Sequence, residues 1–245
     1  MNNQQLKSSL GILEKEIVSI YGAGGKSTLL RLLAEELSGD GRKVVVTTTT
    51  KIYQHPDLPL VLGLNLQEAA NGLKNNLAGS PLVILAGELL QGYKLKGIDP
   101  SWPGRLIEEP EVSCILAECD GAAGRPLKGY APYEPVLPPD SSIAVPVLGL
   151  SSLGAILDSE RVHRPALFSE MAGIKMGEII KIEHLIRSMK RMIELGRRQA
   201  PRARVVPVFN QVDQVSDKRV IKRIAGFMAG YPEVDRLLFV SARQP

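Results

Sequence analysis

The chain has 245 residues, a hydrophobic fraction of 44% and a formal net charge of +4 at pH 7. This length suits one α/β domain over residues 1–245, with a small loop-rich insertion around 121–175, because single cores stop growing not far above it. There is no run of 18 apolar residues and no signal-peptide pattern at the N-terminus, so we expect a cytoplasmic protein without a membrane partner.

Composition also argues against disulfides and nucleic-acid binding. Cys114 and Cys119 lie five residues apart in one apolar run, where a strand holds their Cα atoms too far apart to bridge. We therefore expect free thiols. The basic residues are scattered except for a cluster at 187–204, which we interpret as a solvated helix face, and we expect no nucleic-acid partner.

Short apolar and β-branched runs predict seven strands along the chain. They are Glu16–Tyr21, Lys43–Thr49, Leu82–Ala86, Ser113–Cys119, Ser142–Leu148, Arg204–Phe209 and Arg236–Ser241. Most are continuously apolar, as is typical of strands covered on both faces. Their alternation with helical patterns predicts an α/β fold with a doubly wound, mostly parallel sheet of P-loop NTPase-like architecture, and leaves antiparallel edges open.

The clearest helix is expected from Ser27 to Leu37, where leucines recur at helical spacing before Gly39-Asp40-Gly41 ends it. Further helices are predicted at Leu66–Leu77, Pro165–Gly173, Ile182–Gln199 and Asp217–Ala229, the last opening with an aspartate as cap. Residues 121–139 contain five prolines and three glycines, which predicts a long ordered loop.

A glycine-rich turn joins the first strand to the first helix, with the residues Gly22-Ala23-Gly24-Gly25-Lys26-Ser27-Thr28. Glycines let backbone N–H groups approach phosphate oxygens, and the helix N-terminus adds its positive end. We expect Lys26 to reach the β and γ phosphates and the Ser27 hydroxyl to ligate Mg²⁺. Thr28 would be a second hydroxyl near the metal or a helix cap. The expected cofactors are Mg²⁺ and ATP or GTP.

The turn is shorter than the usual phosphate-binding pattern G-x-x-x-x-G-K-[ST], because Ile20 stands five residues before Gly25. The shorter form G-x-x-G-K-[ST] resembles the ATP loop of the Mur-type peptidoglycan ligases. The alternative is a glycine-rich turn between strand and helix that binds no ligand.

Two carboxylates, Glu118 and Asp120, end the apolar run that begins at Cys114. Side chains alternate along a strand, so we expect both to face one metal ion or reacting oxygen, as catalytic and Mg²⁺-binding groups. The alternative is an acidic strand end that only caps a loop. Cys119 should face the other way and pack as a small hydrophobic residue.

Near the C-terminus, Asn210-Gln211-Val212-Asp213 follows one predicted strand and Ser241-Ala242 ends another. The pair resembles the base-recognition motifs N-K-x-D and S-A of GTP-binding proteins. That resemblance implies that Asp213 accepts from guanine and that Asn210 braces the loop, although Gln211 replaces the lysine. The alternative is an Asn-Asp turn after a strand.

Other polar segments are candidates for substrate contacts. The threonines of Thr47-Thr48-Thr49-Thr50 follow the second strand at the edge where open α/β sheets bind ligands. Their hydroxyls are candidates for contacts with phosphate, Mg²⁺ or substrate, and the alternative is that threonine is simply a good strand residue. Cationic or hydrogen-bonding side chains on predicted loops are candidates for an anionic substrate or for simple surface charge: Lys94, Lys96, Arg125, Lys128, His163 and Arg164.

Taken in order, these motifs resemble the YqeC family of selenium cofactor biosynthesis proteins over nearly the whole chain. The segments that carry the resemblance are Gly22–Thr28, Thr47–Ile52, Lys94–Ile98, Glu118–Ala122, Arg125–Lys128, Val162–Pro165 and Asn210–Asp213. The resemblance implies a P-loop fold that uses ATP or GTP. It also implies a role in maturing selenium-dependent molybdenum hydroxylases, with the hydroxylase or its pterin cofactor as partner.

The leading hypothesis is a Mg²⁺-dependent NTPase in which Lys26 holds phosphates, Ser27 ligates the metal, and Glu118 and Asp120 complete its shell or orient the nucleophile. A second hypothesis is a ligase or kinase that phosphorylates a small acceptor. A third is a non-hydrolysing chaperone whose affinity for the hydroxylase or cofactor is switched by nucleotide.

Overall fold

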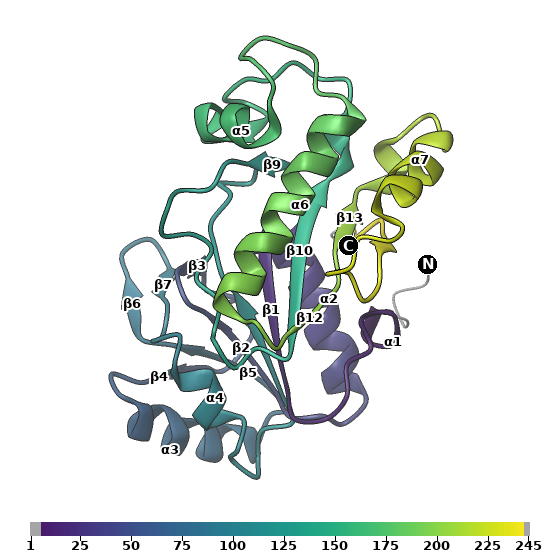
Figure 1. Cartoon of the computed structure of the whole chain (residues 1–245). Coiled ribbons are helices and arrows are strands. Elements are labelled where there is room, and N and C mark those ends of the chain that lie inside the picture. The colour runs from purple at the N-terminus through teal and green to yellow at the C-terminus, as the bar shows by residue number, and fades with distance from the viewer. Residues whose placement is uncertain (1–5, 243–245) are drawn as a thin grey trace.

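A computed structural model describes residues 6–242 of the chain. Its centre is a sheet with the strand order β14-β13-β10-β1-β8-β2-β5-β4, and β12 also pairs with β10 (Figure 1). All strand pairs described in this sheet are parallel. Its strands are β1 (Glu16–Gly22), β2 (Val44–Thr48), β4 (Leu60–Leu62), β5 (Leu82–Ala86), β8 (Cys114–Glu118), β10 (Ile143–Gly149), β12 (Arg204–Val205), β13 (Val208–Asn210) and β14 (Leu238–Phe239).

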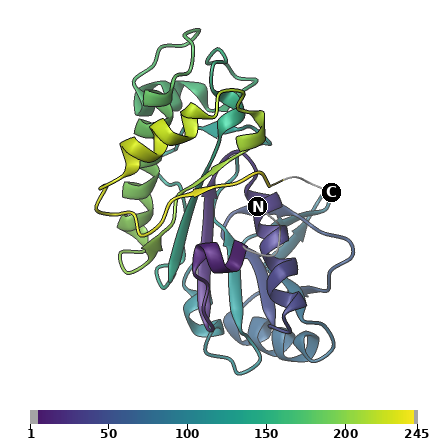
Figure 2. The ribbon, with the colours of Figure 1, turned by 90° about the vertical axis from the view of Figure 1, so that its right-hand side faces the viewer.

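Helices cover both faces of the sheet. In Figure 1, α6 crosses in front of the strands and α2 lies behind them, and Figure 2 shows α2 and α7 on opposite sides. The helices are α1 (Leu6–Leu10), α2 (Lys26–Gly39), α3 (Leu66–Leu77), α4 (Trp102–Leu106), α5 (Pro165–Ala172), α6 (Ile182–Gln199) and α7 (Arg219–Met228), with short 3-10 turns η2 (Leu150–Ser152) and η3 (Val212–Gln214). No helix among residues 6–242 is both long and apolar enough to cross a membrane.

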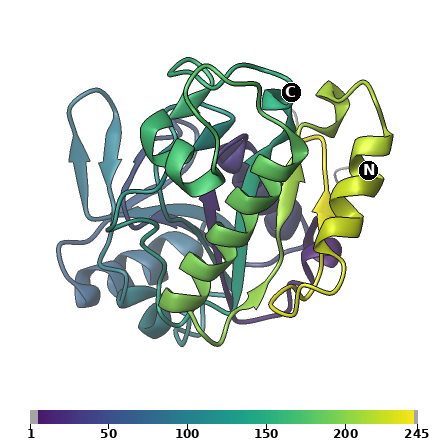
Figure 3. The ribbon, with the colours of Figure 1, turned by 45° about the horizontal axis from the view of Figure 1, so that its top comes forward.

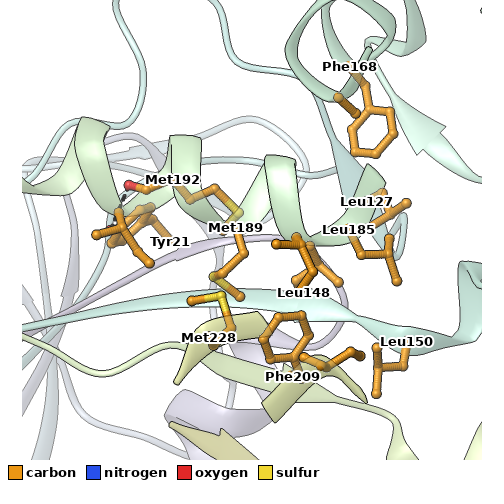
Figure 4. Packing of buried hydrophobic residues seen from close by; sticks show 14 of the residues in the cluster. Tyr21, Leu127, Leu148, Leu150, Phe168, Leu185, Met189, Met192, Phe209 and Met228 are labelled. Carbon is orange, nitrogen blue, oxygen red and sulfur yellow. Dashed lines mark hydrogen bonds between the residues drawn. The ribbon is translucent and has the colours of Figure 1, made fainter. Parts of the chain in front are cut away.

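The side chains of β1 explain why both faces need cover. Val18 and Ile20 pack into the cluster that contains α2, whereas Ile17 and Tyr21 join the clusters on the opposite face. This alternation has the period of two expected for a strand. On the second face, the Tyr21 hydroxyl donates to the carbonyl oxygen of Met192 at 3.1 Å, among the buried side chains of Figure 4. The continuous apolar run is thus that of a strand buried on both sides.

The structure confirms the predicted doubly wound α/β class. The strand Leu82–Ala86 and the helices Leu66–Leu77 and Ile182–Gln199 have the predicted bounds. The prediction of one continuous strand at Arg204–Phe209 is wrong. The segment divides into β12 and β13 around Pro207, which has no backbone N–H to donate. The last predicted strand is shortened to β14.

Two small sheets were not predicted. The short strands β9 (Leu127–Lys128) and β11 (Val162–His163) pair in parallel and join the loop-rich segments on either side of β10. The strands β3 (Lys51–Tyr53), β6 (Glu88–Leu90) and β7 (Lys94–Lys96) form an antiparallel sheet, whose β6–β7 hairpin projects from the body at the left of Figure 3. The antiparallel pairing left open by the sequence therefore lies outside the central sheet.

Candidate phosphate-binding site

The glycine turn lies at the carboxyl edge of the sheet, between the two strands that flank β1. Ile20 is in register with Glu118 on β8, and Gly22 is in register with Val147 on β10. The turn then leads into α2, which begins at Lys26. Ligands of open parallel sheets bind at this edge, so the fold places the turn where a ligand is expected.

Close packing explains the glycines of the turn. A Cβ atom at Gly24 would lie 2.3 Å from the backbone nitrogen of Gly149, and one at Gly25 would lie 2.4 Å from Asn210 Nδ2. Both residues have positive φ angles, +83° and +109°, which side chains disfavour. A larger residue at either position would therefore push the turn away from its neighbours.

The turn uses its backbone amides in two ways. Gly22 N donates to both carboxylate oxygens of Asp120 at 3.0 Å, Ala23 N donates to the carbonyl of Val147, and Gly24 N donates to the carbonyl of Arg125. Within residues 6–242, no hydrogen bond is described from the amides of residues 25–28. The open donors are therefore confined to the second half of the predicted turn.

These open amides form the first turn of α2. The N-cap residue is Gly25, and no side chain caps the helix, so Thr28 does not have the predicted alternative role of a cap. Ser27 is exposed, whereas Gly22, Ala23 and Gly24 are buried. The N–H groups that a helix leaves unpaired at its N-terminus, with the positive end of its dipole, suit an anion.

Lys26 lies inside the turn, with only 4% of its side chain exposed. Its Nζ donates to the Gly22 carbonyl at 2.9 Å and lies 3.3 Å from Asp120 Oδ1 and 3.6 Å from Glu118 Oε1. Burial opposes the charged ammonium, but the two carboxylates outweigh it and raise the pKa of Lys26. The lysine therefore keeps its positive charge inside the turn.

The Ser27 hydroxyl donates to Glu118 Oε2 at 2.9 Å. Burial raises the pKa of Glu118, although Lys26 and Ser27 act in the opposite direction. A hydroxyl beside one carboxylate fits Mg²⁺, which is commonly held by one or two carboxylates together with substrate phosphates and water. Among residues 6–242, no cluster of three or more His, Cys, Asp or Glu side chains could hold a metal ion.

Asp120 and Glu118 face the same group, as strand alternation predicted, because both lie beside Lys26. Asp120 is fully buried, and it accepts from Gly22 N and contacts Lys128 Nζ at 3.1 Å. The structure thus gives Asp120 a bracing role in the turn, and its predicted role at the metal stays a prediction.

Asn210 and Asp213 connect the C-terminal strands to the turn. Asn210 Nδ2 donates to the Gly24 carbonyl at 2.8 Å, and its Oδ1 accepts from Ala242 N at 2.9 Å. The backbone N–H of Asp213 donates to the Ser241 hydroxyl at 3.2 Å. The geometry brings together the two motifs that resembled base-recognition elements, with Asn210 bracing the turn.

The other candidate polar residues have different positions. Thr47, Thr48 and Thr49 donate their hydroxyls to backbone carbonyls of Leu85, Glu118 and Val136, so they hold strand ends together. Lys94 and Lys96 lie on the exposed strand β7. Arg125 donates to the Ser159 carbonyl, and Arg164 contacts Glu134.

Lys128 differs from the sequence expectation of a loop cation. Its ammonium is buried between Asp120 and Glu134, which lie 3.1 Å away in each case. Sequence reasoning missed Glu134, because the proline-rich loop around it carries no periodic signal that would indicate a buried acid.

Cys119 packs as a small buried residue, as predicted. Burial raises its pKa to about 12, and the same cause raises the pKa of Cys114 to about 12. Both cysteines are free and buried. Neither thiol has the depressed pKa of a reactive cysteine.

The parallel sheet with a glycine turn opening α2 defines an α/β protein of doubly wound, P-loop NTPase-like architecture. Residues 18–166 match the family model described as YqeC protein. Over 173 residues the chain is 34% identical to "Uncharacterized protein YqeC" of Escherichia coli (strain K12), covering 69% of this chain and 66% of that relative. The chain thus spans about two thirds of the length of this curated relative. It belongs to the YqeC family, and the matched region contains the turn, Glu118 and Asp120.

Proposed function

We propose that the protein binds a nucleoside triphosphate with Mg²⁺ at the turn formed by residues 22–28, and hydrolyses it. The observation that carries the proposal is the set of open amides at residues 25–28 beside the charged Lys26 and the Ser27–Glu118 pair. Backbone donors, a lysine and a hydroxyl next to a carboxylate are the groups that phosphoryl-transfer sites use.

Each group has a role in the proposed reaction. The amides of residues 25–28 bind phosphate oxygens, and Lys26 turns from its carboxylates toward the β and γ phosphates. Ser27 and Glu118 hold Mg²⁺, which when bound would neutralise charge that develops on the phosphates. Asp120 keeps the turn in shape through the Gly22 amide, and with Glu118 it is the candidate for orienting the attacking water.

We place the base beside Asp213 and Ala242 and expect GTP to bind more tightly than ATP. The support is Asn210, whose side chain holds the Gly24 carbonyl and the Ala242 amide at once. By the resemblance to the base-recognition motif of GTP-binding proteins, the Asp213 carboxylate would accept from the two N–H donors on the edge of guanine, which adenine lacks. Replacing Asp213 with alanine should therefore reduce the affinity for GTP more than that for ATP.

For the cellular role, we propose that nucleotide hydrolysis serves selenium cofactor biosynthesis in the maturation of selenium-dependent molybdenum hydroxylases. The support is the family resemblance, and the partner would be the hydroxylase or its pterin cofactor. Phosphate release that depends on an added small acceptor would instead indicate a ligase or kinase. Tight binding without turnover in the presence of the hydroxylase would indicate a nucleotide-switched chaperone.

Thermal unfolding with each of the four nucleoside triphosphates, with and without Mg²⁺, tests the proposed binding. A nucleotide at 100 times its dissociation constant stabilises the folded state by about 2.7 kcal/mol. We expect GTP with Mg²⁺ to raise the unfolding midpoint of the wild type and of a Lys74→Ala control on α3, but not that of Lys26→Ala. The proposal is wrong if no triphosphate stabilises the wild type, or if Lys26→Ala responds like the control.

A further inference from the structure

A buried series of alternating charges runs from the glycine turn into the loop-rich segment. Asp120 lies between two ammonium groups, with Lys26 Nζ 3.3 Å from Oδ1 and Lys128 Nζ 3.1 Å from Oδ2. Lys128 also lies 3.1 Å from Glu134, and Glu134 contacts Arg164 at the outer end. The turn and the segment 121–164 are therefore joined by charge as well as by backbone.

Lys128 has no room to bind a ligand itself. Its side chain is 1% exposed, and its ammonium donates to the Gly121 carbonyl at 2.7 Å and to Glu134 at 3.1 Å while it contacts Asp120. The nitrogen also lies over the ring of Tyr130, 4.8 Å from the ring centre. The ammonium thus donates two hydrogen bonds and forms an ion pair with a third oxygen, and a buried lysine with this many partners is fixed in place.

The charges around Asp120 determine whether Lys26 can leave this carboxylate and turn toward phosphate. In the structure, Lys26 and Lys128 share Asp120, and Lys26 also faces Glu118. When Lys26 turns toward phosphate, Asp120 keeps one cation only because Lys128 is present. Without Lys128, moving Lys26 would leave a fully buried carboxylate with no cation beside it, which is strongly unfavourable.

The segment that carries Lys128 is itself attached to the turn. The carbonyl of Arg125 accepts from Gly24 N, and the carbonyl of Pro126 accepts from Gly149 N, each at 3.1 Å. On the other side, β9 pairs with β11, which leads into α5. These backbone contacts set the position of Lys128 relative to Asp120 independently of its charge.

We propose that Lys128 is a positioning residue for nucleotide binding, which neutralises Asp120 so that Lys26 is available to phosphate. The inference rests on the proposed function and adds to it a residue that touches neither nucleotide nor metal. Lys128 acts through Asp120, so its effect should vanish when the carboxylate of Asp120 is removed.

A double-mutant cycle tests this coupling through the dissociation constant for GTP with Mg²⁺. We expect Lys128→Met to weaken binding at least tenfold relative to the wild type. In an Asp120→Asn background, which keeps an oxygen for the Gly22 amide, the same substitution should change the dissociation constant less than threefold. Lys190→Met is the matched control, because Lys190 lies 5.0 Å from the ring centre of Tyr231 but has no ion pair described within residues 6–242.

The outcomes separate a positioning role from a structural one. Lys128→Met with a lowered unfolding midpoint but wild-type affinity would overturn the inference, as would an equal loss of affinity in both backgrounds. If Lys128→Met does not fold, the comparison of Asp120→Asn with the double variant still decides, because a large difference between them contradicts action through Asp120. A wild type that binds no triphosphate overturns the proposed function itself, and Lys128 then has no nucleotide to position.

Discussion

Asn210 donates a hydrogen bond from its side-chain Nδ2 to the carbonyl oxygen of Gly24 at 2.8 Å. The same side chain accepts from the backbone of Ala242, and it is fully buried. A single amide therefore holds the glycine turn against the end of the sheet that lies nearest the C-terminus. The shape of the turn depends on a residue 186 positions away in the sequence.

We expect Asn210→Ala to lower the free energy of unfolding by about 2–3 kcal/mol, because it removes two hydrogen bonds and leaves a buried carbonyl unpaired. Affinity for the triphosphate should fall at least tenfold as the turn loosens. Urea unfolding and a nucleotide titration measure the two effects.

Asn76→Ala is the matched control for Asn210. Asn76 Nδ2 also donates to a glycine carbonyl, that of Gly72 at 2.9 Å, but it lies on α3 away from the turn. Asn76→Ala should lower the free energy of unfolding by about 1 kcal/mol and leave nucleotide affinity unchanged. Equal nucleotide affinity for both variants would contradict the bracing role.

Gly24→Ala should lower the free energy of unfolding by more than the positive φ angle of residue 24 accounts for. Its Cβ would lie 2.3 Å from Gly149 N, whereas a Cβ at Gly41, at the far end of α2, would have no heavy atom within 4 Å at a similar φ of +80°. Gly41→Ala should cost about 1 kcal/mol from backbone strain. Gly24→Ala should cost several times more and abolish nucleotide binding, as thermal unfolding with and without GTP would measure. A similar loss of stability in both variants would show that the close approach to Gly149 is unimportant.

Ser27→Ala should remove the dependence of nucleotide binding on Mg²⁺ while leaving the fold intact. Ser27 is exposed, and its hydroxyl contacts Glu118 at 2.9 Å. Losing one metal ligand should weaken binding about tenfold or more in the presence of Mg²⁺ and little in its absence. Ser38→Ala, near the other end of α2, is the control and should bind like the wild type. A Mg²⁺ response in Ser27→Ala equal to that of the control would exclude Ser27 as a ligand.

Glu118 adds a pH dependence to the same measurement. Burial raises the pKa of Glu118, so this carboxylate takes up a proton at a higher pH than an exposed glutamate does. The Mg²⁺-dependent part of nucleotide affinity should therefore be lost as pH falls. The loss should occur at a pH above the range in which an exposed glutamic acid titrates. A titration of affinity against pH, compared with Glu88→Gln on the exposed strand β6 and with Glu118→Gln, checks the assignment. Only Glu118→Gln should remove the pH-dependent step.

The sequence predicted most of the sheet and the position of the turn, because strands buried on both faces carry continuous apolar runs and glycine-lysine-serine marks the strand-to-helix junction. It did not predict the partners of the turn. The Gly24 amide donates to the carbonyl of Arg125, and Lys128 is buried against Glu134. Both contacts depend on a proline-rich loop without periodicity. The open amides therefore lie at the start of α2, which only the folded chain reveals.

The pKa of Cys119 gives a prediction about stability at alkaline pH. Burial raises that pKa to about 12, while an unfolded thiol ionises near 8.5. A raised pKa in the folded state contributes stability that is present below the unfolded value and is lost as pH rises toward the folded value. Between about pH 9 and 12, the free energy of unfolding should therefore fall, with up to about 1.4 kcal/mol per pH unit from this thiol.

Cys119→Ala removes this contribution, so its stability should fall less steeply over the same pH range, even though its stability at pH 7 is lower because a buried atom is lost. Urea unfolding of both proteins at pH 8, 9 and 10 gives the two slopes. Burial also raises the pKa of Cys114, Tyr21 and Tyr130. Both proteins keep these residues, and only the part of the Tyr21 shift that comes from Cys119 differs between them. Parallel slopes, or rapid reaction of native Cys119 with a thiol reagent at pH 8, would mean that the thiolate forms in the folded state and that the residue is not the inert packed group described above.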